Sequence, residues 1–79
     1  YNFSLALQRA GYWLDAVDEL DKLLASRPDD AKVHFSLGKL YAERLARTDL
    51  ARVHYRKVLE LQPLHAQASA IRFWLAAHP

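Results

Sequence analysis

The sequence of 79 residues contains no cysteine, no methionine, two glycines and three prolines. Without cysteine there is no disulfide framework, no thiolate ligand for zinc and no thiol nucleophile. Two isolated glycines cannot build a phosphate-binding loop, and no G-x-x-x-x-G-K, G-x-G-x-x-G or G-x-S-x-G motif occurs. No apolar run approaches the roughly 20 residues that a membrane-spanning helix needs. We therefore expect a chain that is not an enzyme and that holds no cofactor.

The residues that are abundant are those of helical proteins. Leucine (14) and alanine (13) make up about a third of the chain, and 52% of all residues are hydrophobic while 25% are charged. A chain of this length supports only one small core. No segment alternates polar and apolar residues with the period of two that marks a strand. The composition thus predicts a single all-α domain.

The net charge of +2 conceals an uneven distribution along the chain. Residues 1–30 carry three basic and six acidic side chains, a balance of −3, whereas residues 31–79 carry eight basic and three acidic side chains, a balance of +5. Such a chain can steer partners or let copies stack head to tail. We favour the simpler interpretation that these charges solvate outer helix faces and pair between neighbouring helices.

An internal repeat is visible at offsets of 34 and 35 residues. The offset of 34 relates Phe3 to Leu37, Ser4 to Gly38 and Leu7 to Tyr41, and the offset of 35 relates Ala16 to Ala51, Leu20 to Tyr55, Leu23 to Val58, Leu24 to Leu59 and Pro28 to Pro63. The change of offset lies between Tyr41 and Ala51, where a turn accommodates an extra residue. The repeating unit is therefore two helices joined by a turn.

Helical spacing of apolar residues, together with capping and helix-breaking residues, predicts five helices. The first covers residues 3–10 and is closed by Gly11, and the second runs from residue 13 to a point before Pro28. The third runs from about residue 30 to 46, with Asp29 or Asp30 as its N-cap. The fourth begins at an N-cap of Thr48 or Asp49 and stops before Pro63, and the fifth covers about residues 65–77.

The second unit reads His34-x2-Leu37-Gly38-x2-Tyr41, then Ala51-x3-Tyr55, then Pro63. It resembles the tetratricopeptide repeat, a helix-turn-helix unit of about 34 residues with the pattern W-x2-L-G-x2-Y, A-x3-F and P. Here His34 replaces the first aromatic residue. The resemblance implies antiparallel helix pairs stacked as a right-handed superhelix. It divides the chain into a first repeat that lacks its start (residues 1–28), a second repeat (29–63), and a capping helix or partial third repeat (64–79).

The resemblance also implies where a ligand binds. In that family the first helix of each pair lines a concave groove, and its non-motif residues contact the ligand. The corresponding residues here are Asn2, Leu5, Arg9, Lys32, Phe35, Ser36, Lys39, Glu43 and Trp74, with Tyr1, Gln8, Gln67 and Ala70 beside them. Lys32, Phe35 and Lys39 are spaced to share a helix face, which suits a peptide with acidic and apolar side chains. The chain is thus expected to be a protein-protein interaction module.

Two alternatives remain open at this point. The chain can be a structural or self-associating segment of a longer array, because Ile71, Phe73, Trp74 and Leu75 offer an apolar patch and such arrays usually need three or more units. In that case the array continues beyond one or both ends or copies associate. The second alternative is nucleic-acid binding through the basic stretch formed by Arg44, Arg47, Arg52, Arg56 and Lys57. The four histidines lack the spacing of metal ligands.

Overall fold

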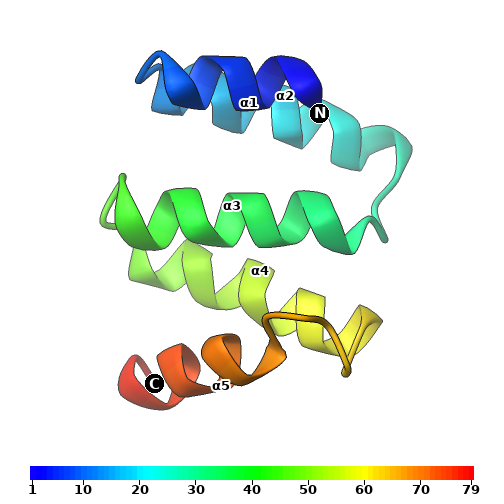
Figure 1. The fold of residues 1–79 in the computed structure, drawn as a ribbon, viewed down its shortest axis with the longest axis vertical. Helices are drawn as coiled ribbons and strands as arrows, with labels where there is room; N and C mark the ends of the chain where they lie inside the picture. Colours follow the sequence, from blue (N-terminus) through cyan, green and yellow to red (C-terminus); the bar gives the residue numbers. More distant parts are fainter.

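The computed structural model describes all 79 residues and contains five α-helices and no strand, so the predicted all-α fold class is confirmed. The helices are α1 (Asn2–Arg9), α2 (Trp13–Ser26), α3 (Ala31–Glu43), α4 (Thr48–Leu61) and α5 (Ala68–Ala77). In Figure 1, α1 and α2 lie at one end of the long axis, α3 and α4 lie in the middle, and α5 lies at the other end. None of the five helices has the length and apolar character needed to cross a membrane.

Several helix ends lie where the capping residues predict them. Gly11 follows α1 with a left-handed φ of 84°, a conformation that glycine adopts without a steric penalty. The Asp30 carboxylate accepts hydrogen bonds from the backbone N–H groups of Lys32 (3.0 Å) and Val33 (3.3 Å), so Asp30 is the N-cap of α3. Helices α2 and α4 both end before a proline. The structure confirms these ends. They were predictable because each depends on a local residue preference.

Three other helix ends differ from the sequence prediction. Helix α3 ends at Glu43 rather than residue 46, because Ala46 adopts a left-handed φ of 53° that stops the helix. The N-cap of α4 is Arg47, which offers no capping side chain, so the expectation of Thr48 or Asp49 is wrong. Helix α5 begins at Ala68 rather than near His65, whose Nδ1 accepts a hydrogen bond from the Gln67 N–H (2.9 Å) in a turn. Side-chain hydrogen bonds of this kind compete with helix formation.

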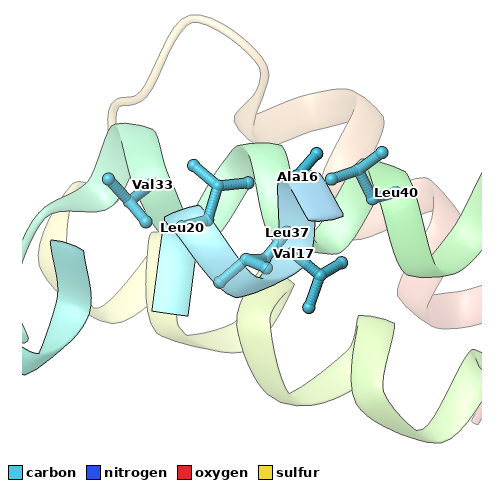
Figure 2. Packing of buried hydrophobic residues seen from close by; sticks show 6 residues of the cluster. All are labelled: Ala16, Val17, Leu20, Val33, Leu37 and Leu40. Atoms are coloured by element: carbon cyan, nitrogen blue, oxygen red, sulfur yellow. The ribbon is translucent and has the colours of Figure 1, made fainter. Parts of the chain in front are cut away.

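The larger part of the core lies between α2 and α3. It is a cluster of fully or almost fully buried side chains, shown in Figure 2: Ala16, Val17 and Leu20 from α2, and Val33, Leu37 and Leu40 from α3. Partly buried residues of the neighbouring segments, among them Leu7 and Tyr41, pack around it. The joint between the two predicted repeats is therefore an apolar contact between the second helix of one unit and the first helix of the next.

Within the second unit, α3 and α4 approach each other closely at Gly38. A Cβ atom at this position would lie 2.6 Å from two ring carbons of Tyr55, so only glycine fits without a shift of the ring. The other small residues of the repeat, Ser4, Ala16 and Ala51, are completely buried as well. Small residues at these buried positions allow paired helices to lie close together. A second cluster of Tyr55, Val58 and Ile71 joins α4 to α5.

The charged side chains make only local ion pairs. These are Lys22 with Glu19 (3.1 Å), Arg47 with Asp49 (3.2 Å) and Lys57 with Glu60 (3.5 Å), all exposed or partly exposed. No ion pair joins two helices, which corrects the expectation that charged side chains pair between neighbouring helices. Arg52 instead donates to the carbonyl oxygens of His78 (3.4 Å) and Pro79 (3.3 Å). Burial, and then the charge of nearby Asp21, raise the pKa of Tyr41.

A pair of histidines links α3 to α4 on the side where Tyr41 stacks on His54. His34 Nε2 lies 2.7 Å from the carbonyl oxygen of Pro28, and its Nδ1 lies 3.0 Å from Nδ1 of His54. A carbonyl oxygen only accepts, so His34 Nε2 carries a proton and donates it. One Nδ1 of the pair donates to the other, so the two rings cannot both be fully protonated. Burial, and secondarily the charge of His34, lower the pKa of His54 from 6.5 to about 4.

This histidine pair predicts a loss of stability in mild acid. Between pH 6.5 and 4 the unfolded chain binds a proton at His54 that the folded chain does not, so the free energy of unfolding falls as the pH falls. Because His54 is only half buried, we discount the full shift and expect a loss of about 1 kcal/mol between pH 7 and 5. Urea unfolding at both pH values measures this loss. A His54→Gln variant should lose most of the pH dependence, and an unchanged dependence would contradict the assignment.

Candidate functional site

A groove runs along one side of α3, between α1 and α5. It consists of two hollows, of about 400 Å³ and about 290 Å³, that share Phe35, Lys39 and Glu43 as common walls. These three residues lie at steps of four along α3 and so fall on one helix face. The larger hollow lies on the α1 side of this face and the smaller one on the α5 side. Helix α3 therefore forms the floor of a single extended groove, which we call the α3 groove.

The larger hollow is walled by α1, the start of α2 and α3. Its lining residues are Tyr1, Leu5, Gln8, Arg9, Trp13, Phe35, Ser36, Lys39, Leu40, Glu43 and Arg44. The Tyr1 hydroxyl lies 3.0 Å from the Ser36 hydroxyl, a hydrogen bond that joins the two walls. The backbone carbonyl oxygen of Tyr1 accepts from the Ser4 hydroxyl (2.6 Å). These bonds hold the Tyr1 ring in place at the α1 side of the groove.

Three aromatic side chains are among the eight residues that line the smaller hollow. Its residues are Phe35, Lys39, Glu43, Tyr55, Gln67, Ala70, Ile71 and Trp74. The ring centroids of Tyr55 and Trp74 lie 5.1 Å apart in an edge-to-face contact, and those of Phe35 and Tyr55 lie 6.1 Å apart. Burial, and then the charge of Glu43, raise the pKa of Tyr55 to about 12, so its hydroxyl stays protonated and is a hydrogen-bond donor. The hollow combines aromatic rings with this hydroxyl and with the polar side chains of Lys39, Glu43 and Gln67.

Cations lie over the aromatic rings of the groove. The Lys39 ammonium lies 5.9 Å from the Phe35 ring centroid, and the Arg44 guanidinium lies 4.8 Å from the Trp13 ring. Neither cation takes part in any of the three ion pairs of the chain, and neither does Glu43. Lys39 and Arg44 thus keep their capacity to pair with a carboxylate. The groove offers apolar surface next to unpaired positive charge.

The structure brings most of the sequence-predicted site residues into this groove. Leu5, Arg9, Phe35, Ser36, Lys39 and Glu43 line the larger hollow and Trp74 lines the smaller one, as do their predicted neighbours Tyr1, Gln8, Gln67 and Ala70. Asn2 is exposed and lines neither hollow. Lys32 lies outside both hollows, with its ammonium 4.3 Å from the Tyr1 ring centroid, and borders a polar depression near the turn at Pro28.

Sequence reasoning missed the groove residues contributed by second helices and by the end of α3. Trp13 is the first residue of α2, Tyr55 belongs to α4, and Arg44 follows α3. The repeat pattern assigns Tyr55 to packing, and it packs on Gly38 while one edge of its ring reaches the groove. Trp13 has no counterpart in the second unit, where an offset of 35 places Thr48. The only feature of the sequence that could have indicated its place in the groove is an aromatic residue at the start of a helix.

The basic stretch considered for nucleic acid is divided among different surroundings. Arg44 lies in the groove, Arg47 and Lys57 pair with acids, and Arg52 bonds to the carbonyl oxygens of the last two residues. Nucleic-acid binding usually draws on cations that share one face or groove. No three His, Cys, Asp or Glu side chains gather where they could hold a metal ion. The α3 groove is therefore the best-formed candidate site.

The chain matches no protein-family model, no curated protein and no solved structure. Its resemblance to the tetratricopeptide repeat rests on the residue pattern over residues 1–63, and a functional conclusion rests on the geometry of the α3 groove.

Proposed function

We propose that this chain is a non-catalytic protein-protein interaction module that binds a peptide segment with acidic and apolar side chains in the α3 groove. The observation that carries the proposal is the shared wall of Phe35, Lys39 and Glu43, which joins two hollows into one continuous surface. Catalysis would require titratable groups brought together for proton or group transfer. The groove instead combines aromatic rings with separated charges, which is an arrangement suited to recognition.

The chemistry of the groove defines the ligand. Aromatic and aliphatic side chains of the peptide would fill the hollows beside Trp13 and Trp74, where large flat surfaces contribute most of the binding free energy. A carboxylate between them would pair with Lys39, and Arg44 would receive a second one.

Selection from a library of random short peptides on the immobilised chain tests the proposal. We expect the enriched peptides to combine acidic residues with aromatic or aliphatic ones. A Lys39→Glu variant should weaken the binding of a selected peptide at least tenfold, about 1.4 kcal/mol, because the reversed charge repels the peptide carboxylate. Isothermal titration calorimetry measures the affinity, and circular dichroism checks that the variant melts like the parent chain.

Arg56→Glu is the matched control for this experiment. Arg56 is exposed on α4, lies outside both hollows and makes no ion pair, so its reversal changes the net charge by the same amount as Lys39→Glu. The peptide should bind this variant as it binds the parent chain. Equal loss of affinity in both variants would mean that the net charge of the chain, and not Lys39 in the groove, determines peptide affinity. Enrichment of basic peptides, or full affinity in the Lys39→Glu variant, would contradict the proposal.

A further inference from the structure

The two hollows of the α3 groove differ in charge. Phe35, Lys39 and Glu43 belong to both hollows. Beyond these shared residues, the larger hollow adds two basic side chains, Arg9 and Arg44, and no acidic one. The smaller hollow adds no charged side chain. The charges that line the larger hollow therefore leave an excess of two positive charges, whereas those that line the smaller hollow cancel.

Both aromatic rings that belong only to the larger hollow lie beneath a cation. The Arg44 guanidinium lies 4.8 Å from the Trp13 ring centroid, and the Lys32 ammonium lies 4.3 Å from the Tyr1 ring centroid. A guanidinium held over an indole ring keeps its outer N–H groups free, and it loses less conformational freedom when two of them bind a carboxylate. The larger hollow is therefore prepared for a carboxylate at Arg44.

The aromatic rings that belong only to the smaller hollow carry no such cation. These rings are Tyr55 and Trp74, which meet edge to face, and no Lys or Arg side chain lies over either of them. The His78 ring stacks on Trp74 at a centroid distance of 4.2 Å, and His78 Nδ1 lies 2.9 Å from the Trp74 carbonyl oxygen. An indole ring that is already held in place can bind an uncharged aromatic side chain at a low cost in conformational entropy.

Glu43 makes the smaller hollow unfavourable for a carboxylate. Burial, and then the charge of Glu43, raise the pKa of Tyr55, so this charge acts on the smaller hollow. A ligand carboxylate placed there is repelled by Glu43 and attracted only by Lys39. In the larger hollow the same repulsion is outweighed, because Arg9 and Arg44 add to the attraction of Lys39.

We propose that the α3 groove recognises a bipartite ligand, whose carboxylate binds at Arg9 and Arg44 in the larger hollow and whose uncharged aromatic side chain binds at Trp74 in the smaller hollow. This inference rests on the proposed peptide-binding function and adds an order to it. The acidic part of the peptide lies on the α1 side of α3, and the aromatic part lies on the α5 side. Because the two parts cannot exchange places, the peptide binds in one direction.

Two fragments probe the hollows separately in the 15N-labelled chain. Disodium glutarate supplies carboxylates alone, and N-acetylphenylalaninamide supplies an uncharged aromatic ring. At constant ionic strength, glutarate should shift the indole N–H signal of Trp13 and leave that of Trp74 unmoved, and the aromatic fragment should do the reverse. Shifts of the same indole signal by both fragments, the opposite assignment, or no shift with either fragment would overturn the inference.

This experiment needs no selected peptide, so its result is independent of the peptide selection that tests the proposed function. Fragments that do not separate between the hollows, together with acidic peptides that bind, would overturn the order of the ligand and leave the proposed function standing. Fragments that separate as expected, together with a library that yields no binder, would contradict the proposed function and leave the chemical difference between the hollows standing.

Variants at three exposed positions, Arg44, Arg56 and Glu43, complete the test. Arg44→Gln should weaken glutarate binding about fivefold and leave the affinity for the aromatic fragment unchanged. Arg56→Gln removes the same charge outside both hollows and should bind both fragments like the parent chain. Equal losses of glutarate affinity in these two variants would overturn the inference, and circular dichroism should show every variant folded.

Glu43→Gln tests the residue that excludes a carboxylate from the smaller hollow. In this variant glutarate should shift the indole signal of Trp74 as well as that of Trp13, because Lys39 then attracts a carboxylate without opposition. A Trp74 signal that glutarate leaves unmoved in Glu43→Gln would contradict the part assigned to Glu43.

Discussion

Replacing Leu37 with alanine should lower the free energy of unfolding by about 3 kcal/mol. Leu37 is 0% exposed and lies in the contact between α2 and α3, so the shorter side chain leaves a cavity that neither helix can close alone. For a domain of this size that loss corresponds to a drop in Tm of about 15 °C. It is a large share of the total stability, which is about 4 to 12 kcal/mol for a chain of this length. Urea and thermal unfolding followed by circular dichroism measure the change.

Leu64→Ala provides the matched control, since it removes the same atoms from a side chain that is 97% exposed. Its free energy of unfolding should differ from that of the parent chain by less than about 0.5 kcal/mol. Similar losses in the two variants would mean that the α2–α3 contact is not the main core of the molecule.

Gly38→Ser should cost about 2 kcal/mol of unfolding free energy, although serine is the better helix former. The added Cβ would lie 2.6 Å from the Tyr55 ring, which is itself only 5% exposed and cannot move aside freely. The cost of overpacking exceeds the gain of about 0.5 kcal/mol from helix propensity. Urea unfolding measures the difference. A lower free energy of unfolding indicates that the clash with Tyr55 dominates, and a higher one indicates that helix propensity dominates.

The first repeat suggests how to relieve this clash. At the positions equivalent to Gly38 and Tyr55 it carries the slightly larger Ser4 and the smaller Leu20, both completely buried. A double-mutant cycle of Gly38→Ser and Tyr55→Leu should therefore show a favourable coupling of about 1 to 2 kcal/mol. Additivity within about 0.5 kcal/mol would contradict the close contact between α3 and α4.

The parts of the fold that follow from local residue preferences were predictable from the sequence. Asp30 caps α3 with its own carboxylate, and Gly11 takes the left-handed conformation that closes α1. The end of α3 was not predictable, because the left-handed position there is occupied by Ala46, a residue with no preference for it. The Leu45 and Arg47 N–H groups bond back to carbonyl oxygens of Leu40 and Tyr41 and hold this turn. These backbone hydrogen bonds thus override the residue preference at Ala46.

The candidate site was predictable where a first helix supplies it and not where another element does. Helix spacing places Phe35 and Lys39 on one face, and the resemblance to the tetratricopeptide repeat implied that this face lines a groove. The part played by Trp13 depends on how the start of α2 is placed beside α3, which is tertiary information. The His34 and His54 contact escaped prediction for the same reason, because the two residues are 20 apart and lie on different helices.

The two tryptophans allow the most direct test of the α3 groove, because Trp13 lines the larger hollow and Trp74 the smaller one. A selected acidic peptide should be titrated into the 15N-labelled chain while 1H–15N spectra are recorded. Both indole N–H signals should shift together with the backbone signals of Phe35 and Lys39. Unmoved indole signals, with shifts concentrated at Val53 and Arg56 on the exposed side of α4, would contradict binding in the groove.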